Sequence, residues 1–106
     1  MTDGEIDGVF LDLKTTLRNF KREFGMEFLE RVKAKTPVRT GHLQNSWGFT
    51  ETKTDIEIYN TAEYAEYVEY GTERMEPRAM LRATLLEREQ IAEVAAERAD
   101  KKKKKR

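Results

Sequence analysis

Residues 36–47, TPVRTGHLQNSW, separate two stretches of the chain that have different apolar periodicity, and they therefore decide the fold. Pro37 fixes one backbone dihedral, whereas Gly41 can adopt conformations that other residues avoid. Thr40 can cap a short turn at this point. We expect an ordered connector here, between a helical region upstream and strands downstream.

Upstream of the connector, apolar residues recur at steps of three or four, which predicts an amphipathic helix. Asp7 can be its N-cap or lie in its first turn, and Pro37 should end it near Lys35. A helix of roughly 26 residues is about 40 Å long, which exceeds the needs of a small core. Most of the apolar stripe is expected to pack in the core of the same chain, and part of it is expected to face a neighbouring subunit. The stripe consists of Phe10, Leu13, Leu17, Phe20, Phe24, Phe28 and Val32.

Downstream of the connector, apolar and polar residues alternate, which is the pattern of half-buried strands. Trp47 and Phe49 belong to the first such run, and Ile56 and Ile58 belong to the second. The two runs predict a β-hairpin with its turn near Thr52 to Thr54.

Two helical segments are predicted after the hairpin. Asn60 and Glu63 have the spacing of a capping box, and the short helix that follows should end at Gly71. Pro77 should open a last helix, whose apolar spacing weakens toward Ala99. The expected fold class is α+β, with a long N-terminal helix and a C-terminal helix packed on a small antiparallel sheet and a short helix between.

The size of the chain predicts one domain, because 106 residues cannot build two independent cores. We expect residues 1–99 to form this domain. Residues 100–106 are expected to be a disordered basic tail, since a run of like charges repels itself. No stretch is long and apolar enough to span a membrane, and the acidic start does not resemble a signal peptide. The protein is therefore expected to be soluble and made in a cytoplasm.

The residues that usually carry catalysis are scarce, since the chain has no cysteine and one histidine. His42 and Ser46 are four residues apart and could approach each other on a helix, but no nucleophile-elbow pattern surrounds the serine. Pairs such as Glu66 and Glu69 could in principle form a hydrolase dyad or bind Mg²⁺. Their one-turn spacing on an exposed helix face favours solvated charge instead. We expect no enzyme activity, no metal and no cofactor.

Charge is unevenly distributed although the net charge is zero. The segment Lys14–Arg39 has eight basic and three acidic residues, and the segment Glu51–Glu76 has two basic and eight acidic residues. On different faces, these segments could join copies head-to-tail, which is the contact that generates rings. The alternative is that both segments are ordinary solvated surface.

The basic run Lys101–Arg106 and the basic first helix suggest an alternative function, nucleic-acid binding, because clustered cations release counterions from phosphates. No recognised nucleic-acid fold signature accompanies them. A passive solvated tail and non-specific contact with passing DNA also remain open. Removing the tail separates the alternatives, since only DNA binding should then collapse.

Three blocks occur in order along the chain: residues 36–47, residues 64–72 (YAEYVEYGT) and residues 77–81 (PRAML). Together they resemble the minor tail component family of long-tailed phages, whose members are also described as tail-completion, neck or head–tail joining proteins. The resemblance runs from about Phe10 to Leu86, with departures at His42, Tyr70 and Ala79. The matching loop positions are Thr36, Pro37, Thr40, Gly41, Leu43, Ser46, Gly71, Thr72 and Pro77.

This resemblance implies a structural virion protein that is assembled in the host cytoplasm and joins tail to head. Its expected partners are further copies in a hexameric ring, a head-closure or connector protein, and a tail-terminator or tail-tube protein. Large, rigid aromatic side chains suit either the rim of the core or a subunit interface. Of these residues, Trp47 is expected to lie in the core. The candidate interface residues are Trp47, Tyr64, Tyr67, Tyr70, Glu66, Glu69, Arg39 and Arg78.

Overall fold

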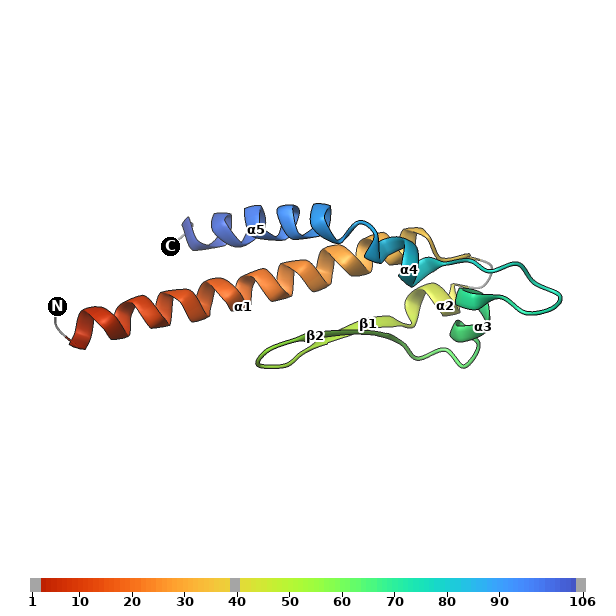
Figure 1. Ribbon diagram of the computed structural model, residues 1–106, viewed down its shortest axis with the longest axis horizontal. Helices are drawn as coiled ribbons and strands as arrows, with labels where there is room; N and C mark the ends of the chain where they lie inside the picture. Colours follow the sequence, from red (N-terminus) through yellow and green to blue (C-terminus); the bar gives the residue numbers. More distant parts are fainter. Residues whose placement is uncertain (1–2, 39–40, 105–106) are drawn as a thin grey trace.

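The computed structural model describes residues 3–38 and 41–104, with side chains for residues 15–38 and 41–101. A long N-terminal helix lies between an antiparallel C-terminal helix on one side and a β-hairpin on the other (Figure 1). This arrangement confirms the α+β fold class. The elements are α1 (Asp3–Ala34), α2 (His42–Asn45), β1 (Trp47–Glu51), β2 (Ile56–Asn60), α3 (Ala65–Tyr70), α4 (Met80–Leu85) and α5 (Arg88–Lys104).

Helix α1 is longer than the sequence predicted, with 32 residues that begin at Asp3. Asp7 therefore lies inside the helix, and its predicted role as N-cap is wrong. The C-terminal end, at Ala34, agrees with the prediction within one residue. Its last turn tightens, because the amide of Thr36 donates to the carbonyl of Lys33 at 3.1 Å. The basic residues Arg31 and Lys33 in that turn complement the helix dipole.

The predicted hairpin is confirmed. Strands β1 and β2 pair antiparallel, with Phe49 opposite Ile58, and Thr52 closes the turn by accepting a bond from the amide of Asp55 at 2.8 Å. Gly25 of α1 allows the hairpin to approach closely, because a Cβ at this position would lie 2.6 Å from the ring of Phe49. A glycine inside a helix costs about 0.5–1 kcal/mol relative to alanine, so close packing is its physical justification.

The predicted capping box between Asn60 and Glu63 is wrong. Helix α3 begins only at Ala65, and Tyr64 at its N-cap position makes no side-chain capping bond. The Asn60 amide instead donates to the carbonyl of Leu43 at 2.9 Å and accepts from the amide of Ala62 at 2.8 Å. Asn60 thereby ties the end of β2 to α2. Gly71 ends α3 with a φ of 80°, as its position predicted.

The single last helix that was predicted from Pro77 is two helices. Helix α4 ends at Leu85, and α5 begins at Arg88 after a turn that lets it fold back along α1 (Figure 1). Glu87 in this turn is held by ion pairs with Arg31 and Lys35 of α1. Helix α5 continues to Lys104, beyond the fraying expected near Ala99. Disorder of residues 100–106 stays a prediction, and residues 105–106 lie outside the described part of the chain.

The core forms where α1, the connector, β1 and the last two helices meet. Phe28 and Val32 of α1 pack there with apolar side chains of the other elements. Ala95 and Ala99 of α5 are also buried, and such small side chains allow close approach of α5. The buried cluster consists of Phe28, Val32, Leu43, Trp47, Ala62, Val68, Met80 and Ile91.

Candidate assembly surface

The connector is fixed by a buried hydrogen-bond chain. Thr36 Oγ1 donates to the carbonyl of Val32 at 2.7 Å and accepts from Trp47 Nε1 at 2.9 Å. Both side chains are buried, so each polar group needs its partner. The bonds link the end of α1 to the start of β1. Trp47 thus lies in the core, and its interface role stays a prediction with little surface left for a neighbour.

The middle of the connector forms a tight turn. Gly41 has a φ of 77°, a left-handed conformation that favours glycine, and its carbonyl accepts from the amide of Asn45. Leu43 anchors the turn in the core, while Pro37 is half-buried. Arg39 and Thr40, a candidate interface residue and a predicted loop residue, lie outside the described residues.

The catalytic alternative at His42 and Ser46 gains no support from the geometry. The Ser46 hydroxyl donates to the backbone carbonyl of His42 at 2.7 Å, which is a local helical bond. The imidazole of His42 lies beside the ring of Tyr64, with 6.0 Å between centroids. Ser46 therefore caps the end of α2, and His42 packs α2 against Tyr64 at the start of α3.

Glu69 corrects the expectation that this acid lies on an exposed face, because the residue is only 5% exposed. Its carboxylate accepts from the amide of Leu81 at 2.8 Å and from the amide and Nε of Arg82 at 3.0 Å each. A carboxylate at a helix N-terminus satisfies free amides and complements the dipole. Glu69 therefore caps α4 from α3. Nothing in the sequence spacing signals this cap.

A second tight turn follows α3. A Cβ at Gly71 would lie 2.8 Å from the carbonyl oxygen of Met75 and from the nitrogen of Pro77, so this position requires glycine. Thr72 and Met75 exchange backbone hydrogen bonds across the turn. The amide of Arg78 donates to the carbonyl of Val68 at 2.8 Å, which returns the chain to α3. The predicted loop residues Gly71, Thr72 and Pro77 thus shape one projecting loop.

Exposed tyrosines and acids gather around α3 and this loop. Tyr67 and Tyr70 are 60% and 61% exposed, and Tyr64 is 40% exposed. The guanidinium of Arg82 lies 4.6 Å above the ring centre of Tyr70, which orients that ring. Arg78 is also exposed. We call this surface the acidic tyrosine end; it comprises Glu63, Tyr64, Glu66, Tyr67, Tyr70, Glu73 and Glu76.

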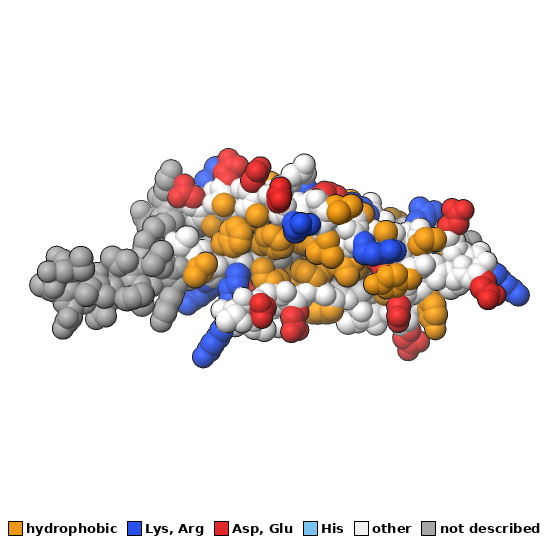
Figure 2. Space-filling model, in the orientation of Figure 1, with side chains coloured by type: hydrophobic (Ala, Val, Ile, Leu, Met, Phe, Trp, Pro, Cys, Tyr) orange, Lys and Arg blue, Asp and Glu red, His pale blue; other side chains and the backbone are white. Residues whose placement is uncertain are grey.

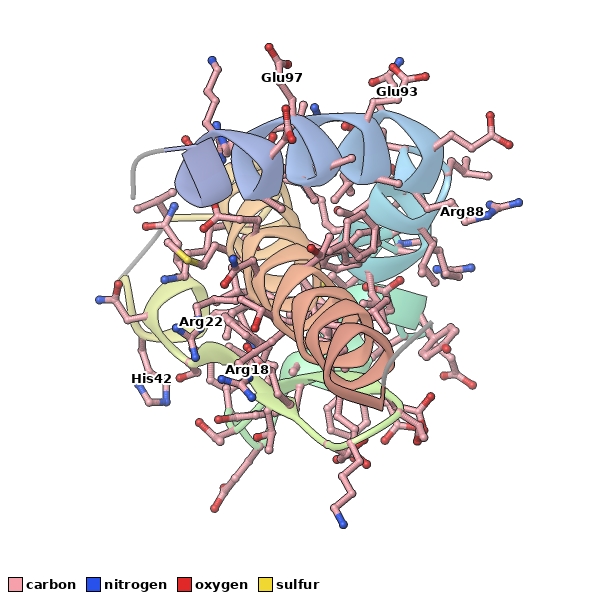
Figure 3. The ribbon with its side chains drawn as sticks, turned by 90° about the vertical axis from the view of Figure 1, so that its left-hand side faces the viewer. Arg18, Arg22, His42, Arg88, Glu93 and Glu97 are labelled. Carbon is pink, nitrogen blue, oxygen red and sulfur yellow. The ribbon has the colours of Figure 1, made fainter. Side chains whose placement is uncertain are left out.

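An open basic groove lies between α1 and the hairpin turn, lined by Leu17, Arg18, Lys21, Glu51, Thr52 and Lys53. Lys21 donates to the carbonyl of Thr52 at 2.6 Å, and Arg22 pairs with Glu51 at 3.5 Å. Figure 3 shows Arg18 and Arg22 on the same side of α1. Glu51, an acid of the segment Glu51–Glu76, is therefore paired inside the same chain with Arg22 of the basic segment Lys14–Arg39. Each segment can thus offer only part of its charge to a partner.

A ladder of ion pairs joins α1 to α5. Glu27 accepts from Arg31 at 2.8 Å and from Arg98 at 3.0 Å. Arg31 and Lys35 also bind Glu87. Hydrogen bonds from Lys35 and then Arg31 lower the pKa of Glu87, and the hydrogen bond to Glu27 raises the pKa of Arg31.

No group of three or more His, Cys, Asp or Glu residues is arranged to hold a metal ion in the described part of the chain. None of the helices within it is both long and apolar enough to cross a membrane.

One of three comparisons with known proteins identifies a family. No curated protein and no solved structure matches the chain. A family model described as "Bacteriophage HK97-gp10, putative tail-component" matches residues 13–71. This match covers more than half of the chain and includes the connector, the hairpin and α3. The chain therefore belongs to the HK97 gp10-like family of bacteriophage tail components.

Proposed function

We propose that the protein is a non-enzymatic virion subunit that forms a ring at the head-proximal end of the tail and joins tail to head. The observation that carries this proposal is the family match over residues 13–71, which spans the first sequence block and all but the last residue of the second. The ring would contact a head-closure or connector protein on one side and a tail-terminator or tail-tube protein on the other. A hexamer is the expected form.

The shape and charge of the subunit support a head-to-tail contact. The molecule measures 66 × 22 × 21 Å, and α3 with its following loop lies at one end of the long axis (Figure 1). The basic groove lies toward the other end, where the hairpin turn meets α1. Two different surfaces that complement each other make a heterologous contact, which closes into a ring when the rotation permits.

Exposed aromatic residues also support this head-to-tail contact. Tyrosine is enriched in interfaces because it offers a large rigid ring with a polar tip. Tyr67 and Tyr70 are more than half exposed within this chain, so their rings are available to a neighbouring copy. We infer that the acidic tyrosine end of one copy meets the basic groove of the next.

A charge exchange tests this contact. Reversal of Arg18 to Glu in the groove, or of Glu66 to Lys at the acidic tyrosine end, should shift purified rings toward monomers of 12.4 kDa. The two changes combined in one chain should restore rings, because each altered surface then meets its complement. Native mass spectrometry or sedimentation measures the result. Rings that persist in both single variants and at high salt would contradict the charge pairing.

A further inference from the structure

A hollow of about 200 Å³ lies between β2, α3 and α4. Ile58, Ala65 and Leu81 line it and are only partly buried where they pack on the core. Figure 2 shows that apolar side chains also gather in a band on the molecular surface between α5 and the hairpin. The hollow thus offers apolar walls to a side chain that enters it from outside.

Two acids also line the hollow, and they differ in their partners. The carboxylate of Glu69 accepts from the amides of Leu81 and Arg82 and pairs with the Arg82 guanidinium at 3.0 Å. Glu66 is exposed, and its carboxylate makes no hydrogen bond or ion pair within the described part of the chain. The hollow therefore combines apolar walls with one negative charge that the described residues leave unpaired.

An arginine side chain matches this combination. Its apolar stem can pack against apolar walls while its charged head binds an exposed acid. Tyr70 also lines the hollow, and a planar guanidinium can lie against a tyrosine ring and bind a carboxylate at the same time. Arg82 already shows this combination, because its guanidinium lies 4.6 Å from the ring centre of Tyr70 and pairs with Glu69. The hollow is thus suited to a second guanidinium.

Arg18 is the cation of the basic groove that fits this role. Lys21 donates to two carbonyls of the hairpin turn, and Arg22 pairs with Glu51. Arg18 is exposed and makes no hydrogen bond or ion pair with the residues that the structure describes. Lys53 also lines the groove, but an ammonium group lacks the planar shape that suits a tyrosine ring.

Arg18 lies too far along α1 to enter the hollow of its own chain. Met80, which lines the hollow, belongs to the same buried cluster as Phe28. Phe28 follows Arg18 by ten residues, which is about 15 Å along a helix. That separation exceeds the length of an arginine side chain, so Arg18 can reach only the hollow of another copy.

We propose that the Arg18 side chain of one copy enters the hollow between β2, α3 and α4 of the next copy and binds Glu66 there. This inference rests on the proposed ring and names the anchor within the contact between the basic groove and the acidic tyrosine end. A single arginine in a well-packed pocket can supply a large share of the binding energy of an interface. The two surfaces are different, so the contact is heterologous and repeats from copy to copy.

A conservative replacement of Arg18 separates this anchor from general charge pairing. Arg18→Lys keeps the positive charge but removes the planar guanidinium, so it should raise the chain concentration at which half of the subunits are in rings by about tenfold. Lys53→Ala removes a charge from the same groove without touching the anchor, and it should change that concentration by less than about threefold. Sedimentation of the purified full-length chains over a dilution series measures both effects.

Blocking the hollow is the second test, because the chain has no cysteine of its own. Ala65→Cys puts a thiol in the lining, and N-ethylmaleimide added to the folded, diluted monomer then fills the hollow without changing any charge. The alkylated variant should stay monomeric at concentrations where the unmodified variant forms rings. Ala96→Cys, at an exposed position of α5, is the matched control and should form rings in both states.

Ring formation at the wild-type concentration by either Arg18→Lys or alkylated Ala65→Cys would overturn the anchor and leave the proposed ring intact. A thiol at position 65 that the reagent cannot reach in the monomer would show that the hollow is closed, and this result would overturn the anchor as well. A wild-type chain that forms no oligomer, either in solution or in phage particles, would instead overturn the proposed ring itself.

Discussion

The connector region and the helix pair α1–α5 are held together by different interactions. Thr36, Trp47 and Asn60 join the connector to the hairpin by hydrogen bonds that are buried or partly buried. Helices α1 and α5 are instead joined by buried apolar residues and by ion pairs such as Glu27–Arg98, in which the arginine is 46% exposed. The family match covers the connector and hairpin but not α5. The connector region is thus held by directional hydrogen bonds, whereas α5 is held by apolar contacts and partly exposed ion pairs.

The largest effect should come from removing the anchor of the connector. Trp47→Ala should lower the free energy of unfolding by about 3–5 kcal/mol, because a large buried side chain leaves a cavity. Denaturant unfolding of the purified chain measures this loss. The matched control is Tyr67→Ala at an exposed position, which should change stability by less than about 0.5 kcal/mol. If Trp47→Ala and Tyr67→Ala lowered the free energy of unfolding equally, Trp47 would not be the anchor of the connector.

An intermediate effect is expected at the cap of α4. Glu69→Ala leaves the amides of Leu81 and Arg82 without their acceptor and should destabilise the fold by about 1–3 kcal/mol. Glu66→Ala, one turn earlier on the exposed face, is the matched control and should be nearly neutral. A neutral Glu69→Ala would show that water satisfies these amides and that the cap contributes little.

The smallest effect should appear at the ion pairs between α1 and α5. The pKa of Glu87 is lower in the folded chain than its ordinary value of 4.5, so its contribution to stability is present above pH 4.5. That contribution is lost as the pH falls through the lower, folded pKa. The stability difference between wild type and Glu87→Gln should therefore be small near neutral pH and vanish in acid. A difference that grows as the pH falls would contradict the lowered pKa.

The sequence predicted the features that repeat along the chain. The apolar steps of α1, the alternation in β1 and β2, and the turn near Thr52 all follow from local periodicity. Residue types also marked Gly41 and Gly71 as turn positions, and both have positive φ values.

The sequence did not predict features that depend on contacts between distant segments. Glu69 was expected on a solvated face, because no spacing rule reveals that the start of α4 folds back onto α3. Gly25 was not singled out, since its role depends on the ring of Phe49 on the far side of the connector. The break between α4 and α5 was missed for the same reason, because it is stabilised by Arg31 and Lys35 of α1.

The same limit applies to the candidate interface. Residue type suggested exposed aromatics and charges, and the structure leaves Tyr64, Tyr67, Tyr70, Glu66 and Arg78 accessible while it buries Trp47 and Glu69. Burial within one chain decides which of these side chains a neighbour could reach. Sequence spacing alone cannot supply that information, because the buried members are covered by α1 and α4.

The most direct test of the joining role is electron microscopy of particles produced with the gene disrupted. The proposed function predicts separate DNA-filled heads and unattached tails, and joined particles when the wild-type chain is supplied in trans. Supplying the chain without residues 101–106 should also restore joining, because the proposed contacts lie elsewhere. Normally joined particles in the absence of the gene would contradict the joining role and favour the alternative of a nucleic-acid-binding accessory protein.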